Sequence, residues 1–157
     1  MVFTGLTQPC MLVYGEKIAQ IMHNSEHFPH RPTLAVGIGL RQGATSSHVE
    51  SAVRAALGPR RLEEIATLAT LDTKADHPAL AQFCSRHGIA LRAFCAADIN
   101  ACFDRHPTLR RSAAALAHVG VAGVCEPCAL LAAQDGTLLV AGQAHGGVTV
   151  AVAATRP

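Results

Sequence analysis

The feature that most constrains the fold is a continuous apolar run of strand length at 33–40, which leads directly into a glycine-rich loop. An unbroken apolar run of this length is typical of a strand that is buried on both faces of a sheet. Residues 47–50 (SHVE) then have the spacing of a capping box, and apolar residues follow at helical spacing until Gly58. A doubly buried strand followed closely by a helix favours a layered α/β domain.

The alternation of strand and helix continues along the chain. Strand-length apolar runs at 65–71 and 89–94 flank a predicted helix that Asp76 caps, that has Pro78 in its first turn and that ends at Gly88. Three further helices are expected at 96–103, 109–118 and 124–133. An antiparallel pair of strands follows at 137–141 and 148–153, with a loop at 142–147. This order predicts a three-layer α/β/α fold with a mixed, mainly parallel sheet of about five strands that ends in an antiparallel C-terminal hairpin.

Length and composition indicate one globular domain. The chain has 157 residues, of which 50% are hydrophobic and 15% are charged. Residues 1–31 lack a clear strand and are expected to be a loosely ordered extension, so that the domain occupies 32–157. The net charge is +2 and the basic residues are dispersed, which argues against a nucleic-acid partner.

Membrane attachment is not expected, because no apolar run reaches the roughly 20 residues of a membrane span. The apolar patch at 10–13 has no basic residue before it, unlike a signal peptide. We therefore expect a cytoplasmic protein whose six cysteines are reduced thiols.

The loop after the first predicted strand has features of an anion-binding site. Glycines allow the backbone to approach a ligand closely, and the start of the next helix directs free N–H groups and a positive dipole end toward it. The candidate ligand-binding residues here are Gly37, Gly39, Arg41, Gly43, Thr45 and Ser46. The G-x-G-x-x-x-G spacing does not match a dinucleotide-binding fingerprint, and a P-loop is excluded by the lack of Gly-Lys-Ser/Thr. A tight turn without a ligand is the alternative.

The loop after the second predicted strand contains Asp72 and Lys74. Because loops that follow neighbouring parallel strands leave the same edge of a sheet, we expect both side chains to lie near the glycine-rich loop. The alternative is that Asp72 and Asp76 cap the following turn and that Lys74 is merely solvated. Two candidate loops on one edge favour a binding site.

Three segments resemble one protein family. VGIGLRQG, ATLDTKAD and GQAHGGVTVAVA, in this order and spacing, resemble the CobE / CbiG C-terminal domain family of cobalamin biosynthesis over 33–153. The family's CbiG proteins are longer and open a lactone in a cobalt-precorrin intermediate of the anaerobic route. At this length the chain looks like the stand-alone CobE of the aerobic route.

The resemblance implies a precorrin or corrinoid intermediate as the ligand and other cobalamin-pathway enzymes as further partners. Such a macrocycle is largely apolar and is fringed with acetate and propionate carboxylates. Arg41, Lys74, the glycine-loop backbone and the nearby hydroxyls are suited to hold those carboxylates. We expect a carrier or accessory protein. The alternative is a hydrolase that opens a lactone or acyl group, with Asp72 or His145 as the base and Lys74 or loop N–H groups as oxyanion donors.

No metal and no cofactor is expected from the sequence. Cys125-Glu126-Pro127-Cys128 lacks the second ligand pair that a structural zinc site needs, and it begins a predicted helix rather than following a strand. The cysteines are therefore interpreted as small packing residues, and we identify no chelating spacing among the histidines. The family often has lysines before the Gly-Gly of the hairpin, whereas this chain has His145. Either His145 takes over a polar role or the loop contributes no charge.

Overall fold

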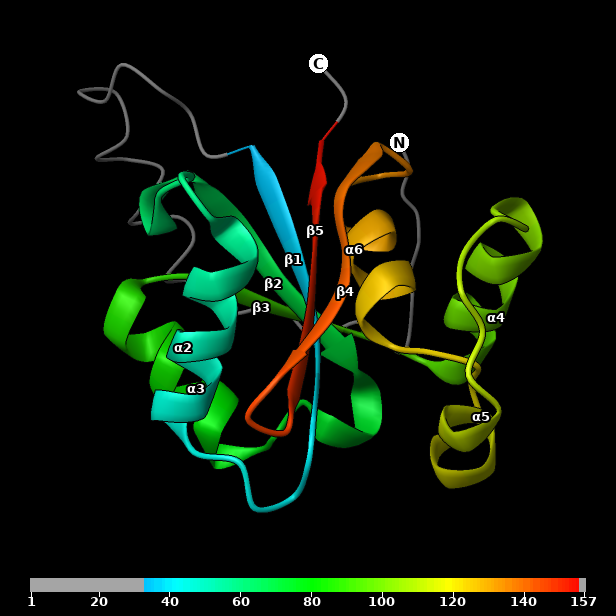
Figure 1. Cartoon of the computed structure of the whole chain (residues 1–157), viewed down its shortest axis with the longest axis horizontal. Helices are drawn as coiled ribbons and strands as arrows, with labels where there is room; N and C mark the ends of the chain where they lie inside the picture. The colour runs from blue at the N-terminus through cyan, green and yellow to red at the C-terminus, as the bar shows by residue number, and fades with distance from the viewer. Residues whose placement is uncertain (1–32, 156–157) are drawn as a thin grey trace, which may run out of the picture.

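The computed structural model describes residues 33–155, so the extension expected at 1–31 lies outside the described residues. Helices cover both faces of a five-stranded sheet whose strand order is β3-β2-β1-β5-β4 (Figure 1). The elements are β1 Leu34–Leu40, α2 Ser46–Leu57, η2 Leu62–Glu64, β2 Ile65–Leu71, η3 Asp72–Lys74, α3 Pro78–His87, β3 Ala90–Phe94, α4 Ala96–Arg105, α5 Ala113–Val119, α6 Cys125–Ala132, β4 Thr137–His145 and β5 Val148–Ala154. The predicted α/β/α architecture is confirmed.

The sheet is mixed, as the sequence predicts. β1 pairs in parallel with β2, and β2 pairs in parallel with β3. On its other side β1 pairs antiparallel with β5, which forms the C-terminal hairpin with β4. Leu40 at the end of β1 is opposite Val148 at the start of β5. The hairpin turn therefore lies at the same edge of the sheet as the loop that follows β1.

The two faces of β1 carry side chains of very different size. Val36 and Ile38 pack into the core beneath α2 and α3. Ala35 belongs to the second core, which lies under α4 and α6. Gly37 also faces α6, and a Cβ atom there would overlap the carbonyl oxygen of Cys125. Strand β1 is thus buried on both faces, but α6 rests directly on its backbone.

Helix α6 is the central element of its layer. All but one of its eight residues are buried, because the sheet covers one side and α4 contributes Ile99, Cys102 and Phe103 to the same core. In contrast, α5 has no buried residue, and the side chain of Leu116 is 55% exposed. No helix in the described part of the chain has the length and apolar character needed to span a membrane.

Two predicted boundaries are wrong for physical reasons. Strand β4 continues to His145 through residues predicted as loop, and only Gly146 and Gly147 form the turn. Both glycines have positive φ, of 60° and 84°, as a two-residue hairpin turn requires. The pairing of β4 also shifts register between Val140 and Gln143, so its apolar pattern is irregular.

Helix α5 begins only after Ser112, whose hydroxyl accepts a hydrogen bond from the backbone N–H of Ala115.

We predict that Gly37→Ala destabilises the protein strongly, whereas Gly43→Ala does not. The first substitution forces a methyl group into the backbone of α6, and overpacking of this kind costs about 1–3 kcal/mol or more. A Cβ atom at Gly43 meets nothing within 4 Å, so its effect should stay within about 0.5 kcal/mol. Urea unfolding of the two variants measures the difference. Equal free energies of unfolding would contradict the packing of α6 on β1.

Candidate functional site

The loops that follow β1 and β2 are joined by His77. Its Nδ1 accepts a hydrogen bond from the backbone N–H of Ala79 at 3.1 Å. The proton of the neutral ring is therefore on Nε2, which donates to the carbonyl oxygens of Arg41 and Gln42 at 3.1 and 2.9 Å. The backbone N–H of His77 in turn donates to the Lys74 carbonyl at 3.1 Å. This confirms the expectation that the two loops lie together at one edge of the sheet.

The Thr45 hydroxyl of the first loop caps the start of α2. Thr45 is the N-cap, and its Oγ1 accepts from the backbone N–H of His48 at 3.2 Å. His48 Nδ1 accepts from the backbone N–H of Thr45 at 3.2 Å, which completes a capping box. The box therefore begins at Thr45 rather than at the predicted Ser47, because a histidine nitrogen takes the place of the usual carboxylate. Ser46 is the first residue of the helix and is half-buried.

Arg41 lies along the hairpin turn. Its backbone N–H donates to the Gly147 carbonyl at 3.2 Å, and a Cβ atom at Gly147 would lie 3.3 Å from Arg41 Cδ. The aliphatic part of Arg41 thus passes over a residue without a side chain, while the residue as a whole is exposed. His145 ends β4 at the same turn and is also exposed. The edge therefore brings the hairpin together with the two loops.

The second loop contains the short helix η3, formed by residues 72–74. Asp72 is exposed and Lys74 is half-buried. The Asp72 carbonyl accepts from the backbone N–H of Ala75 at 3.2 Å, which closes this turn. The next helix is capped by His77 rather than by the predicted Asp76. The ring of His77 accepts from Ala79 and donates to the first loop at once, whereas an ionised carboxylate can only accept.

The three candidate glycines have different roles. Gly37 is buried under α6, where a Cβ atom would overlap the backbone of that helix. A Cβ atom at Gly39 would meet Val124 at 3.5 Å, an ordinary contact, and Gly39 lines a pocket. Gly43 is exposed in open space. Gly39 and Gly43 are therefore the two of these glycines whose surroundings leave room for a ligand.

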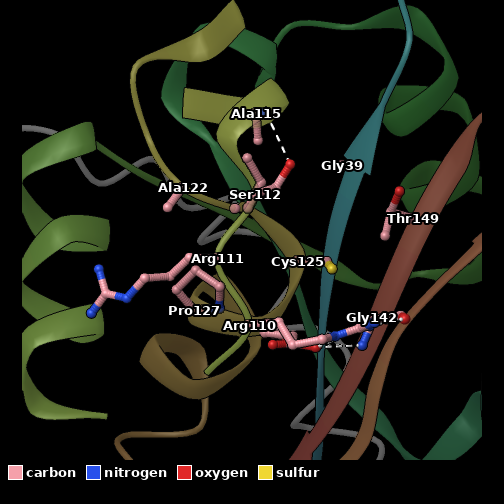
Figure 2. A pocket seen from close by; sticks show the side chains of 13 residues that line it. Gly39, Arg110, Arg111, Ser112, Ala115, Ala122, Cys125, Pro127, Gly142 and Thr149 are labelled. Atoms are coloured by element: carbon pink, nitrogen blue, oxygen red, sulfur yellow. Dashed lines mark hydrogen bonds and ion pairs between the residues drawn. The ribbon is translucent and has the colours of Figure 1, made fainter. Parts of the chain in front are cut away.

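A pocket of about 370 Å³ opens between the sheet and the start of α6 (Figure 2). Gly39 and Thr149 line it from the sheet, and Val124 and Pro127 line it from α6. Arg110 crosses one side and points toward β4, whereas the side chain of Arg111 is turned toward α4. The second orientation agrees with the hydrogen bond from Arg111 Nη2 to the Phe103 carbonyl at 3.2 Å.

Glu126 is a buried carboxylate beside this pocket and is only 6% exposed. Its Oε2 accepts from the backbone N–H of Gly142 at 2.7 Å and lies 3.7 Å from Arg110 Nη2. Arg110 Nη2 also donates to the Gly142 carbonyl at 2.8 Å. The register shift in β4 is thus compensated by a side chain from α6 and one from the α4–α5 linker. The position of Glu126 in the first turn of α6 adds a favourable helix-dipole interaction.

The cysteines near the pocket are thiols rather than reactive thiolates. Burial, aided by the neighbouring Glu126 carboxylate, raises the pKa of Cys125 to about 12. Burial also raises the pKa of Cys128 well above its ordinary value. A thiol with such a pKa is a poor nucleophile at neutral pH. This agrees with the interpretation of Cys125 and Cys128 as packing residues.

Sequence reasoning missed the pocket and the Glu126 network. One signal was present, an acidic residue in the first turn of a predicted helix. It does not identify its partner, because Glu126 and Gly142 are far enough apart in sequence that only the packing of α6 on the sheet brings them together.

Comparison with known proteins identifies the family. The family described as "Cobalamin synthesis G C-terminus" matches residues 34–153. The chain belongs to this family. This membership places it among proteins of cobalamin biosynthesis and confirms the resemblance seen in the sequence.

Three relatives give more detail. The crystal structure of CobE, a protein from the cobalamin (vitamin B12) biosynthetic pathway, has a TM-score of 0.71 and 30% identity, and the match covers 83% of this chain and 97% of CobE. Cobalamin biosynthesis protein ChiG from Agrobacterium tumefaciens has a TM-score of 0.63 and 34% identity, with coverage of 79% and 99%. The cobalt-precorrin-5A hydrolase of Priestia megaterium is 26% identical over 127 residues, which are 79% of this chain and 33% of the hydrolase. The chain thus spans about a third of that curated relative.

We predict that Glu126→Ala destabilises the protein by about 1.5–3 kcal/mol, because it leaves the partly buried Gly142 N–H without its charged acceptor. Glu126→Gln should cost less, since an amide oxygen can still accept. The matched control is Glu63→Ala, where an exposed carboxylate is removed and the change should stay within about 0.5 kcal/mol. Chemical unfolding measures all three. An alanine variant as stable as the wild type would contradict this role of Glu126.

Proposed function

We propose that this protein binds a precorrin or related corrinoid intermediate through its peripheral carboxylates and acts as a carrier or accessory protein in cobalamin biosynthesis. One observation carries the proposal: two cationic residues, Arg41 and Lys74, belong to loops that His77 joins at one edge of the sheet. Arginine and lysine are the side chains suited to hold carboxylates.

The pocket and the loops supply the two kinds of contact that such a ligand needs. Gly39 lines the pocket near the end of β1 and is two residues before Arg41, which directly follows the strand. Thr149 pairs with Gly39 and is two residues after Gly147, on which Arg41 lies. The pocket and the cationic loop therefore share the ends of two paired strands, β1 and β5. The pocket volume of about 370 Å³ suits one edge of a macrocycle, with the remaining carboxylates directed to the exposed rim.

Binding is favoured over hydrolysis by the state of the candidate bases. Asp72 and His145 are both exposed. In the described part of the chain neither side chain has a hydrogen bond that orients it, whereas a general base needs a fixed position relative to water and substrate. The similarity to a precorrin hydrolase covers 33% of that enzyme, and so supports a shared ligand class more than a shared reaction.

The proposal predicts that a polycarboxylate corrinoid, such as hydrogenobyrinic acid, co-elutes with the purified protein with unchanged mass. Arg41→Ala and Lys74→Ala should each weaken binding by about tenfold, which corresponds to the loss of about 1.4 kcal/mol from one charge-assisted contact. Affinity should also fall as salt is added, because Arg41 is exposed and Lys74 is partly exposed. Absorbance titration at two ionic strengths measures both effects.

The control is Arg61→Ala, which removes an exposed arginine from the loop that precedes β2, at the opposite edge of the sheet. This variant should bind normally. Full retention of the corrinoid by both Arg41→Ala and Lys74→Ala would refute the proposed site. A product one water heavier than its precorrin-5-type precursor, lost in Asp72→Ala, would establish the hydrolase instead.

A further inference from the structure

Three side chains with the chemistry of metal ligands meet where α4 contacts the turn between α6 and β4. Cys102, His106 and Asp135 each direct one ligand atom into a space in which these atoms lie within 4.8 Å of one another. None of the three belongs to the pocket or to the edge loops. This cluster, here called the α4 cluster, has no part in the proposed corrinoid site.

The fold holds the three residues in place through two separate devices. Cys102 and His106 are four residues apart at the end of α4, so their side chains lie on the same helix face. The backbone N–H of His106 donates to the Cys102 carbonyl at 2.9 Å. Asp135 comes from the turn after α6, where it has a φ of 57° and its N–H donates to the Leu130 carbonyl at 2.8 Å. A helix end and a left-handed turn thus converge before any ion binds.

We propose that the α4 cluster binds a divalent cation of borderline softness, Zn²⁺ or Co²⁺. A thiolate, an imidazole nitrogen and a carboxylate oxygen form a ligand set that suits these ions. His106 Nε2 lies 3.0 Å from Asp135 Oδ1. Two ligand atoms at about 2.0–2.1 Å from a tetrahedral ion are separated by about 3.3 Å, so a small opening admits the cation. Three protein ligands leave the fourth position to water.

The burial of the cluster fits an ion that enters from solvent. Cys102 is fully buried and forms the floor, while His106 and Asp135 are half-buried and form the mouth. Cys102 Sγ lies 3.7 Å from the Pro127 carbonyl, a weak thiol contact that coordination replaces. On binding, the thiol proton leaves to solvent and the sulfur donates its electron pair to the metal. No oxidation or reduction takes place.

Arg105 competes with the cation for Asp135. Its Nη2 lies 3.1 Å from Asp135 Oδ1, the same oxygen that His106 contacts. The Arg105 side chain is 46% exposed, so it can turn into solvent when the ion enters. Without a metal the cluster is an ion-pair network that ties α4 to the turn. The metal site and the plain ion-pair network predict different effects when Arg105 is removed. The ion-pair network becomes weaker, whereas the affinity of a metal site for its cation increases.

The test is titration of the reduced full chain with Co²⁺, followed by absorption. Wild-type protein should develop thiolate-to-cobalt charge-transfer bands in the near ultraviolet and visible d–d bands of a four-coordinate ion, at one ion per chain, and Zn²⁺ should displace them. Cys102→Ser should abolish the charge-transfer bands, and His106→Ala should weaken binding by at least about tenfold. Arg105→Gln should bind Co²⁺ more tightly than the wild type.

Two cysteine variants serve as matched controls. Cys84→Ala removes a buried thiol from the core beneath α2 and α3, and Cys10→Ser removes the cysteine outside the described residues; both should retain the bands. Circular dichroism checks that each variant folds, and Asp135→Asn provides a second ligand variant of nearly equal size. Bands that persist in Cys102→Ser, or a folded wild type that binds no Co²⁺, would overturn the proposal. So would weaker binding by Arg105→Gln.

Discussion

The contact between the α6 backbone and Gly37 of β1 is the constraint on which the rest of the structure depends. Because the strand has no side chain at this point, the helix lies against its backbone instead of one side-chain layer away. This depth allows Glu126, in the first turn of α6, to reach the N–H of Gly142 across the sheet. It also sets the wall of the pocket beside Gly39. In the sequence, Gly37 suggests a ligand-binding loop. In the structure it allows α6 to pack directly on β1, and α6 in turn shapes the pocket.

His77 is the corresponding element on the other face of the sheet. A neutral imidazole has one acceptor and one donor, and both are used: the acceptor caps α3 and the donor binds two carbonyl oxygens of the first loop. An aspartate in the same place could cap the helix but could not donate. The histidine therefore links the ends of β1 and β2 in a way that an acidic cap does not allow, and it holds Arg41 and Lys74 in adjacent loops.

The sequence was sufficient for those features that depend on local pattern. Strand β2 has the predicted bounds because a doubly buried strand is apolar throughout, and the family resemblance rests on segments that the fold brings to one edge. The caps were misplaced by one or two residues because several polar residues compete at each helix start, and tertiary contacts decide between them. The register shift of β4 and the α4 cluster could not be predicted from the sequence, for a different reason. Cys102 and His106 have a visible helical spacing, but Asp135 joins them only through the packing of α6.

The pocket lies at the start of α6 and Asp135 of the α4 cluster follows its last turn, while Cys102 of the cluster contacts the carbonyl of Pro127 near the start of the helix. Their geometries are therefore coupled, since any tilt of α6 on β1 moves both. Arg41 lies on the hairpin turn and Arg105 on the end of α4, and both residues are exposed, so solvent and salt screen these two charges. A charge change at one site should leave ligand affinity at the other site unaltered. A change in how α6 packs on Gly37 should alter the ligand affinity of the pocket and of the α4 cluster together. A residue that shapes the sites therefore affects both affinities, whereas a residue that binds a ligand affects one.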